Sequence, residues 1–203
     1  MIKLINVTKI FGNRVVLDNI SFTLEDKLIA ILGATGSGKT VLLKIISGLL
    51  KPDTGMVILS DRTSLGCVFQ HAALFDSLTV EENIVLPLLE TTDYSQQTIR
   101  TKLEQILDKL NLSFELLKRK CHNLSGGERK LVAIARAIIT EPCYMLYDEP
   151  TSGLDSDTTL HITHVIKKLK IPGVLVTHDL KVIELLEISE RYLLNMGQLK
   201  KID

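Results

Sequence analysis

The sequence predicts an α/β fold in which helices cover both faces of a mostly parallel sheet. Three short apolar runs are typical of strands that are buried on both sides, namely Leu28–Leu32, Cys143–Tyr147 and Gly173–Thr177. Helical apolar spacing precedes the second run in Glu128–Ile139 and the third in Thr158–Leu169. Strands and helices that alternate in this way indicate a parallel sheet.

The N-terminal part is expected to hold short strands that are joined by turns. Gly12–Asn13 is a turn signal, and Asp26–Lys27 lies between two strand-like runs as the connection of a hairpin does. A helix is expected from Lys39, and Gly48 and Pro52 weaken or end it. Its apolar face is expected to hold Leu42, Leu43, Ile46, Leu49 and Leu50.

The middle of the chain is expected to form a mostly helical insert between two strands of the main sheet. Apolar residues after Ser95 recur at helical spacing, and Ser95 itself is a suitable N-cap. A last strand is expected at Arg191–Asn195. The predicted organisation is one domain over residues 1–203, with a core (1–71 and 126–203) and a helical subdomain (about 72–125).

Bulk composition excludes several classes of protein. The 203 residues contain 24 Lys and Arg and 24 Asp and Glu, so the formal net charge is zero, which argues against nucleic acid as a partner. No apolar run reaches the roughly 18 residues of a membrane span, and the N-terminus does not resemble a secretory signal. Cys67, Cys121 and Cys143 are widely spaced, so reduced structural thiols of a cytosolic protein are expected rather than a metal site.

A glycine-rich segment follows the first buried run and fits the pattern G-x-x-x-x-G-K-[ST]. Its glycines let backbone N–H groups point at a phosphate, Lys39 neutralises the β- and γ-phosphates, and the Thr40 hydroxyl ligates Mg²⁺. The predicted nucleotide-binding residues of this loop are Gly33, Ala34, Thr35, Gly36, Ser37, Gly38, Lys39 and Thr40. By itself the pattern indicates only an NTPase of the P-loop class.

Two acidic residues follow the second buried run. Asp148 is expected to hold Mg²⁺, directly or through water. Glu149 is placed to polarise a water molecule aimed at the γ-phosphate, which indicates a hydrolase rather than a kinase. The alternative is an exposed acidic helix cap, and the apolar run that leads into these residues disfavours it.

A third segment, Leu124–Glu128, provides a second anion-binding helix end. Ser125 is suited to cap the helix that follows, and Gly126 and Gly127 expose backbone N–H groups at its positive end. A simple helix cap explains Ser125 and one glycine, but it does not explain the whole run.

These segments, with Ser152–Asp155 and His178, occur in the order found in ABC ATPases, and the resemblance extends over essentially the whole chain. It implies that Ser125, Gly126 and Gly127, within the signature segment Leu124–Glu128, bind the γ-phosphate of the nucleotide held by the opposite subunit. Two composite sites then form across a head-to-tail homodimer. Asp155 resembles the D-loop residue that crosses this interface. His178 resembles the switch histidine that contacts the γ-phosphate, although a strand-end histidine taken alone is more often structural.

The resemblance adds three further residues to the site. Gln70 is similar to the Q-loop glutamine that touches Mg²⁺ and the attacking water, and catalytic roles are expected for Glu149, His178 and Gln70. Phe11 aligns with the aromatic residue that stacks on adenine, and Val16 is expected beside the base. Few residues separate Lys39 from Gln70 for this family, so a trimmed antiparallel subdomain is expected. Tyr147 replaces the usual aliphatic residue before Asp148.

The family implies an ATP-hydrolysing subunit that energises a membrane transporter, with ATP and Mg²⁺ as cofactors. The implied partners are a second copy of the subunit and transmembrane permease subunits, at the cytoplasmic face of the inner membrane. A soluble ABC ATPase that acts on ribosomes or DNA is the alternative, but such proteins commonly carry two cassettes or long insertions. A P-loop kinase is disfavoured by Leu124–Glu128 and Glu149.

The segment that follows the Q-loop, Phe69–Ile84, is where transporters of this family dock their membrane helices. Part of it is similar to ATPases of bacterial phospholipid-trafficking systems that work with MCE proteins. This resemblance predicts lipid transport, with an MCE-type or substrate-binding protein as a further partner. Amino-acid, metal and lipoprotein systems remain open, because the residues after Leu124 and Asp148 fit them equally well.

Overall fold

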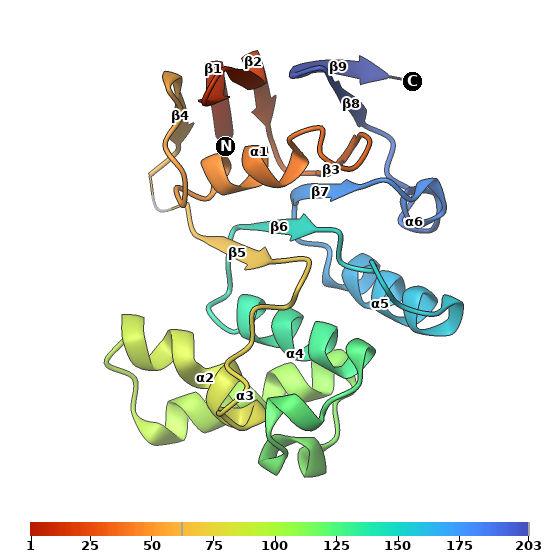
Figure 1. Cartoon of the computed structure of the whole chain (residues 1–203). Coiled ribbons are helices and arrows are strands. Elements are labelled where there is room, and N and C mark those ends of the chain that lie inside the picture. The colour runs from red at the N-terminus through yellow and green to blue at the C-terminus, as the bar shows by residue number, and fades with distance from the viewer. Residues whose placement is uncertain (62, 203) are drawn as a thin grey trace.

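The computed structural model describes residues 1–61 and 63–202, which form two sheets and the helices that pack against them (Figure 1). The strands are β1 (Ile2–Phe11), β2 (Arg14–Leu24), β3 (Leu28–Leu32), β4 (Thr54–Leu59), β5 (Leu65–Val68), β6 (Tyr144–Asp148), β7 (Gly173–Thr177), β8 (Arg191–Asn195) and β9 (Gln198–Ile202). An antiparallel sheet has the order β2-β1-β4, and a six-stranded sheet has the order β5-β6-β7-β3-β8-β9. In the larger sheet β9 pairs antiparallel with β8, and the other neighbours pair in parallel. The predicted fold class is confirmed.

Six helices and two 3₁₀ turns are found in the described residues. They are α1 (Lys39–Ile46), α2 (Val80–Thr91), α3 (Gln96–Leu110), η1 (Phe114–Lys118), η2 (Cys121–Asn123), α4 (Gly126–Ile138), α5 (Ser156–Leu169) and α6 (Leu180–Leu185). The predicted insert is therefore helical, and Ser95 caps α3 through the N–H of Thr98. Helix α4 belongs to the predicted core, yet it packs on α2 and α3 as well as on β5. The division into core and helical subdomain therefore stays a prediction.

The six-stranded sheet separates two hydrophobic cores. Ile29, Ile31 and Val176 pack on one face with α1 and the antiparallel sheet. Tyr147 and Leu175 lie in the other core, with α4 and α5. Figure 1 shows the same layers, with α1 on one side of the sheet and α4 on the other. Successive strand residues point to opposite faces, so a strand with two covered faces needs a continuous apolar run.

The connection between β2 and β3 differs from the prediction. Gly12–Asn13 joins β1 to β2 in an antiparallel hairpin as expected, whereas Asp26–Lys27 leads from one sheet into the other. The hairpin expected at Asp26–Lys27 is therefore wrong. The reason lies in burial: the second half of β2 alternates between buried and exposed residues, but β3 is buried along nearly its whole length and takes a central position.

The end of α1 also differs from the prediction. The helix ends at Ile46, because Gly48 follows in the left-handed conformation at φ 78°. Leu49 lies beyond this turn and is 64% exposed, so its predicted place on the helix face is wrong. Leu50 is partly buried and packs on the core.

Smaller differences concern segment ends and the cysteines. Strand β6 begins and ends one residue later than predicted, and α4 and α5 each begin two residues earlier. Within the described residues the three cysteines form no disulfide; Cys121 is buried, Cys67 is partly buried and Cys143 is exposed. Among the described helices, none has both the length and the apolar content that crossing a bilayer requires.

Candidate active site

Most of the predicted nucleotide-binding and catalytic residues gather where four parallel strands end. Strands β5, β6, β7 and β3 are neighbours in this order, so their carboxyl ends share one edge of the sheet, which is where α/β sheets bind ligands. A cleft of about 300 Å³ lies at this edge. Its lining comprises Phe11, Arg14, Val16, Thr35, Gly36, Gly38, Lys39, Thr40, Val41, Gln70, Glu149 and His178.

The loop between β3 and α1 needs its glycines for two different reasons. Gly36 and Gly38 are left-handed, at φ 78° and 106°, a conformation that costs other residues energy. Gly33 is required by packing, because an added Cβ would lie 2.6 Å from the Leu194 carbonyl oxygen. Gly38 precedes α1 without a side chain to cap it, so the first N–H groups of the helix remain available to an anion.

Lys39 places a buried positive charge in this loop. Its Nζ donates to the carbonyl oxygens of Gly33 at 2.7 Å and Ala34 at 3.2 Å. It also lies 3.6 Å from Glu149 Oε1, and the whole residue is 6% exposed. The ammonium group is thus held between the glycine loop and the acidic end of β6.

Thr40 and Asp148 meet across the two elements that carry them. Thr40 Oγ1 donates to Asp148 Oδ1 at 3.0 Å, and Asp148 is 3% exposed. Burial raises the pKa of Asp148, and the hydrogen bond from Thr40 opposes that effect. Mg²⁺ prefers a few protein oxygens combined with substrate phosphates, and this pair fits that requirement. No cluster of three or more His, Cys, Asp or Glu that could hold a metal alone occurs in the described chain.

Glu149 is held by two residues at the end of β7. Its Oε1 lies 2.9 Å from His178 Nδ1, and its Oε2 accepts a hydrogen bond from Thr177 Oγ1 at 3.2 Å. The Glu149 N–H donates to the Val176 carbonyl oxygen, and the residue is left-handed at φ 47°. Two residues that are distant in the sequence therefore form a carboxylate–imidazole pair at the mouth of the cleft.

Lys130 is a buried residue of the site that the sequence analysis missed. Its Nζ donates to the Gln70 carbonyl oxygen at 2.5 Å and to the Glu149 carbonyl oxygen at 3.3 Å. Lys130 is 5% exposed, and burial lowers its pKa. A lysine near the start of a helix carries no sequence signal for burial, because lysines on helices are mostly solvated.

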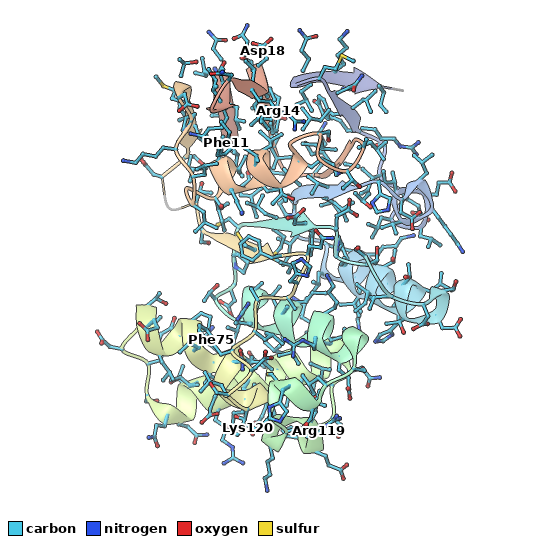
Figure 2. The ribbon with its side chains drawn as sticks, viewed as in Figure 1. Phe11, Arg14, Asp18, Phe75, Arg119 and Lys120 are labelled. Carbon is cyan, nitrogen blue, oxygen red and sulfur yellow. The ribbon has the colours of Figure 1, made fainter. Side chains whose placement is uncertain are left out.

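The outer part of the cleft is formed by the β1–β2 hairpin. Phe11 is 48% exposed, and Val16 is partly buried beside Gly38. Arg14, which the sequence analysis also missed, donates to the Gly36 carbonyl oxygen at 3.4 Å. Figure 2 shows Phe11 and Arg14 on the side of the molecule that carries α1. An exposed aromatic ring beside a phosphate-binding loop is suited to stacking on a base.

The segment Leu124–Glu128 lies apart from this cleft. Ser125 caps α4 in a capping box, since its Oγ accepts from the Glu128 N–H and its own N–H donates to Glu128 Oε2 at 2.7 Å. Ser125 and Gly126 are exposed. All five residues of the segment are described, and none of them lines the cleft. The structure therefore does not bring the predicted signature residues together with the P-loop of the same chain.

Asp155 has a structural partner of its own. Its Oδ1 accepts from the N–H groups of Asp157 and Thr158, and its Oδ2 accepts from Thr158 Oγ1 at 2.7 Å. These bonds lower the pKa of Asp155 and cap α5. The residue is exposed, so the N-cap at the start of α5 faces solvent in the single chain.

The fold and the cleft together define a nucleotide-binding protein of the P-loop class, with a second capped glycine motif outside its own cleft. The comparisons with known proteins name the family. The ABC transporter family matches residues 17–152. The chain belongs to this family, and it is an ABC ATPase whose ATP hydrolysis is coupled to transport.

The relatives agree with this assignment over most of this chain. The arginine transport ATP-binding protein ArtM of Bacillus subtilis is 37% identical over 95% of this chain and 86% of its own length. The molybdate/tungstate import ATP-binding protein WtpC of Methanocaldococcus jannaschii is 40% identical over 89% of this chain but only 63% of its own length. A dimeric ATP-binding cassette solved with ADP and phosphate after hydrolysis superposes with a TM-score of 0.88 at 32% identity. That match covers 100% of this chain and 99% of the cassette.

Proposed function

We propose that Glu149 activates the water that hydrolyses ATP in the cleft beside the P-loop. The observation that carries this role is the pair formed by Glu149 Oε1 and His178 Nδ1 at 2.9 Å, with Thr177 on the other carboxylate oxygen. Both oxygens are thus oriented, and the residue is 7% exposed, as a positioned base should be.

The other residues of the cleft have matching roles in this proposal. The N–H groups of residues 33–40 and the Lys39 ammonium bind the β- and γ-phosphates, and Phe11 and Val16 contact the base. Thr40, Asp148 and the side chain of Gln70 hold Mg²⁺. When bound, Mg²⁺ neutralises phosphate charge. Water then attacks the γ-phosphorus, its proton moves to Glu149, and the bond to the bridging oxygen of ADP breaks. His178 orients the carboxylate and contacts the γ-phosphate.

The test is the substitution Glu149→Gln in the purified chain. We expect ATP binding to remain, while turnover falls by about two to four orders of magnitude, because an amide does not accept the proton. Glu141→Gln is the control, since Glu141 is exposed and pairs with Lys102 away from the cleft. Turnover of Glu149→Gln near the wild-type rate would remove Glu149 from this role.

We further propose that two copies of the chain share their sites. Ser125 and Gly126 are exposed at the N-terminus of α4 and lie outside the cleft of their own chain. A second copy could present this helix end, with Asp155 beside it, to the γ-phosphate that the first copy binds. A dimeric relative solved with ADP and phosphate supports the arrangement.

Mixing two inactive variants tests the shared site. Ser125→Arg blocks the helix end, and Lys39→Ala disables the P-loop, so each homodimer should be inactive. A mixed dimer contains one site formed by the intact P-loop of the first variant and the intact helix end of the second. ATPase activity should therefore return on mixing. No recovery from a mixture that demonstrably dimerises would contradict the proposal.

The transported cargo belongs to a wider proposal. We infer that the chain energises an importer through permease subunits at the cytoplasmic face of the membrane, because relatives are named as importers of methionine, sulfate or thiosulfate, and molybdate or tungstate. The segment after Gln70, in which Phe75 is 53% exposed, is the proposed docking segment. A phospholipid cargo and an MCE-type partner rest on the sequence of this segment alone and stay predictions. Recovery of the chain from membranes with a permease would support transport, whereas recovery with ribosomes would favour the soluble alternative.

A further inference from the structure

Among the described lysines only Lys39 and Lys130 are buried, and Lys130 lies beside the cleft residues Gln70 and Glu149. Its Nζ donates to two backbone carbonyl oxygens, Gln70 at 2.5 Å and Glu149 at 3.3 Å. The carboxylates of Asp148 and Glu149 provide the opposite charge nearby. A buried ammonium group is tolerated only with such partners, so these contacts determine where Lys130 can lie.

The contact with Glu149 acts on a backbone conformation that needs support. Glu149 is left-handed at φ 47°, which is disfavoured for a residue with a side chain. Its N–H is fixed by the Val176 carbonyl oxygen, and its carbonyl oxygen is fixed by Lys130. Because the direction of a side chain follows from its backbone angles, Lys130 helps to aim the Glu149 carboxylate at the cleft.

The contact with Gln70 is one of several hydrogen bonds from side chains of α4 to the backbone of the segment after β5. Ala72 and Ala73 are left-handed at φ 58° and 47°, and their carbonyl oxygens accept from Arg136 at 3.0 and 2.8 Å. Arg136 and Lys130 are both residues of α4. Helix α4, which is capped by the exposed Ser125, therefore holds the backbone of the segment that contains Gln70.

We propose that Lys130 is a positioning residue that links α4 to hydrolysis in the cleft of the same chain. A shift of α4, whose exposed end faces a second subunit in the proposed dimer, moves the two carbonyl groups that carry Gln70 and Glu149. Lys130 touches neither nucleotide nor water in this account. The inference rests on the roles proposed above for Glu149 and Gln70, and it adds the residue through which α4 reaches both.

The test compares Lys130→Met with Lys102→Met in the full-length chain. Lys102 is a partly buried lysine that pairs with Glu141 at 2.7 Å, away from the cleft. For Lys130→Met we expect kcat to fall by about 10- to 100-fold, the effect of a misplaced reacting group, with KM for ATP nearly unchanged. Inhibition by ADP with orthovanadate, which mimics the transferring phosphoryl group, should weaken by the same factor as kcat. Lys102→Met should match the wild type in all three values.

A proportional loss of kcat and vanadate affinity distinguishes a misplaced reacting group from a smaller fraction of folded protein. A variant with fewer folded molecules loses apparent kcat but keeps its vanadate affinity, and that result would overturn the proposal. If Lys130→Met shows no cooperative thermal unfolding, Lys130→Arg replaces it. That substitution retains the charge but not the compact geometry of the ammonium group, so kcat and vanadate affinity should again fall together. Unchanged kcat in Lys130→Arg would then overturn the proposal. If turnover falls in Glu149→Gln but kcat of Lys130→Met equals that of the wild type, only the role of Lys130 fails. If turnover of Glu149→Gln equals that of the wild type, the proposed function fails.

Discussion

Gly127 of α4 faces Thr158 of α5 so closely that the two helices leave no room for a methyl group. A Cβ atom added to Gly127 would lie 2.4 Å from Thr158 Cγ2. Thr158 cannot easily turn away, because β-branched residues are restricted at χ1 in helices and its Oγ1 donates to Asp155 Oδ2 at 2.7 Å. The effect of Gly127→Ala on stability should therefore be determined mainly by this single contact.

The expected magnitude follows from two opposing effects. Overpacking of a well-packed contact costs about 1–3 kcal/mol. Replacing glycine with alanine in a helix contributes about 1 kcal/mol in the other direction. We expect Gly127→Ala to lower the free energy of unfolding by about 1 kcal/mol in the wild-type background. In the background Thr158→Ser, which lacks Cγ2 but keeps the hydroxyl, the same change should raise it by up to about 1 kcal/mol.

Urea unfolding of the four proteins, followed by circular dichroism, measures this double-mutant cycle. The coupling free energy between the two positions should be about 2 kcal/mol, and the effect of Gly127→Ala should change sign between the backgrounds. Equal effects in both backgrounds would show that the methyl group is accommodated in another way, and the reasoning from the helix contact would be refuted.

Two further predictions concern the capping box of α4 and the segment after Gln70. The hydrogen bond from the Ser125 N–H lowers the pKa of Glu128 in the folded state. The ionised Glu128 therefore stabilises the fold fully above the unfolded-state pKa of about 4.3, and this stabilisation is lost as pH falls through the lower folded-state pKa. Glu128→Gln keeps an oxygen acceptor but does not titrate. The melting temperature of the wild type should therefore fall more steeply toward acid pH than that of the variant, and parallel curves of melting temperature against pH would contradict this. Asn83 is fully buried and bonds to the backbone of Phe75 twice. Its Oδ1 accepts from the Phe75 N–H, and its Nδ2 donates to the Phe75 carbonyl oxygen. Asn83→Ala should lower the free energy of unfolding in urea by about 2 kcal/mol, because these groups lose their partner, and a loss below about 0.5 kcal/mol would count against that role.

Local features of the site could be predicted from the sequence because neighbouring residues decide them. The glycine loop before Lys39, the cap at Ser125 and the strand that ends at Asp148 each depend on a few adjacent positions. Helix caps and tight turns are formed by backbone groups within about four residues. The resemblance to ABC ATPases added residues such as Gln70 and Phe11, which line the cleft as expected but have no local pattern of their own.

The tertiary structure decided which of these segments meet. The sequence determined an α/β chain with a phosphate loop and an acidic strand end, but the order β5-β6-β7-β3 places the loop two strands from Asp148, and α1 brings Thr40 across to it. The contact of Glu149 with His178, the burial of Lys130, and the separation of β2 from β3 likewise depend on pairing between distant residues. Such pairing is governed by how apolar faces are covered in three dimensions, which neighbouring residues along the chain do not specify.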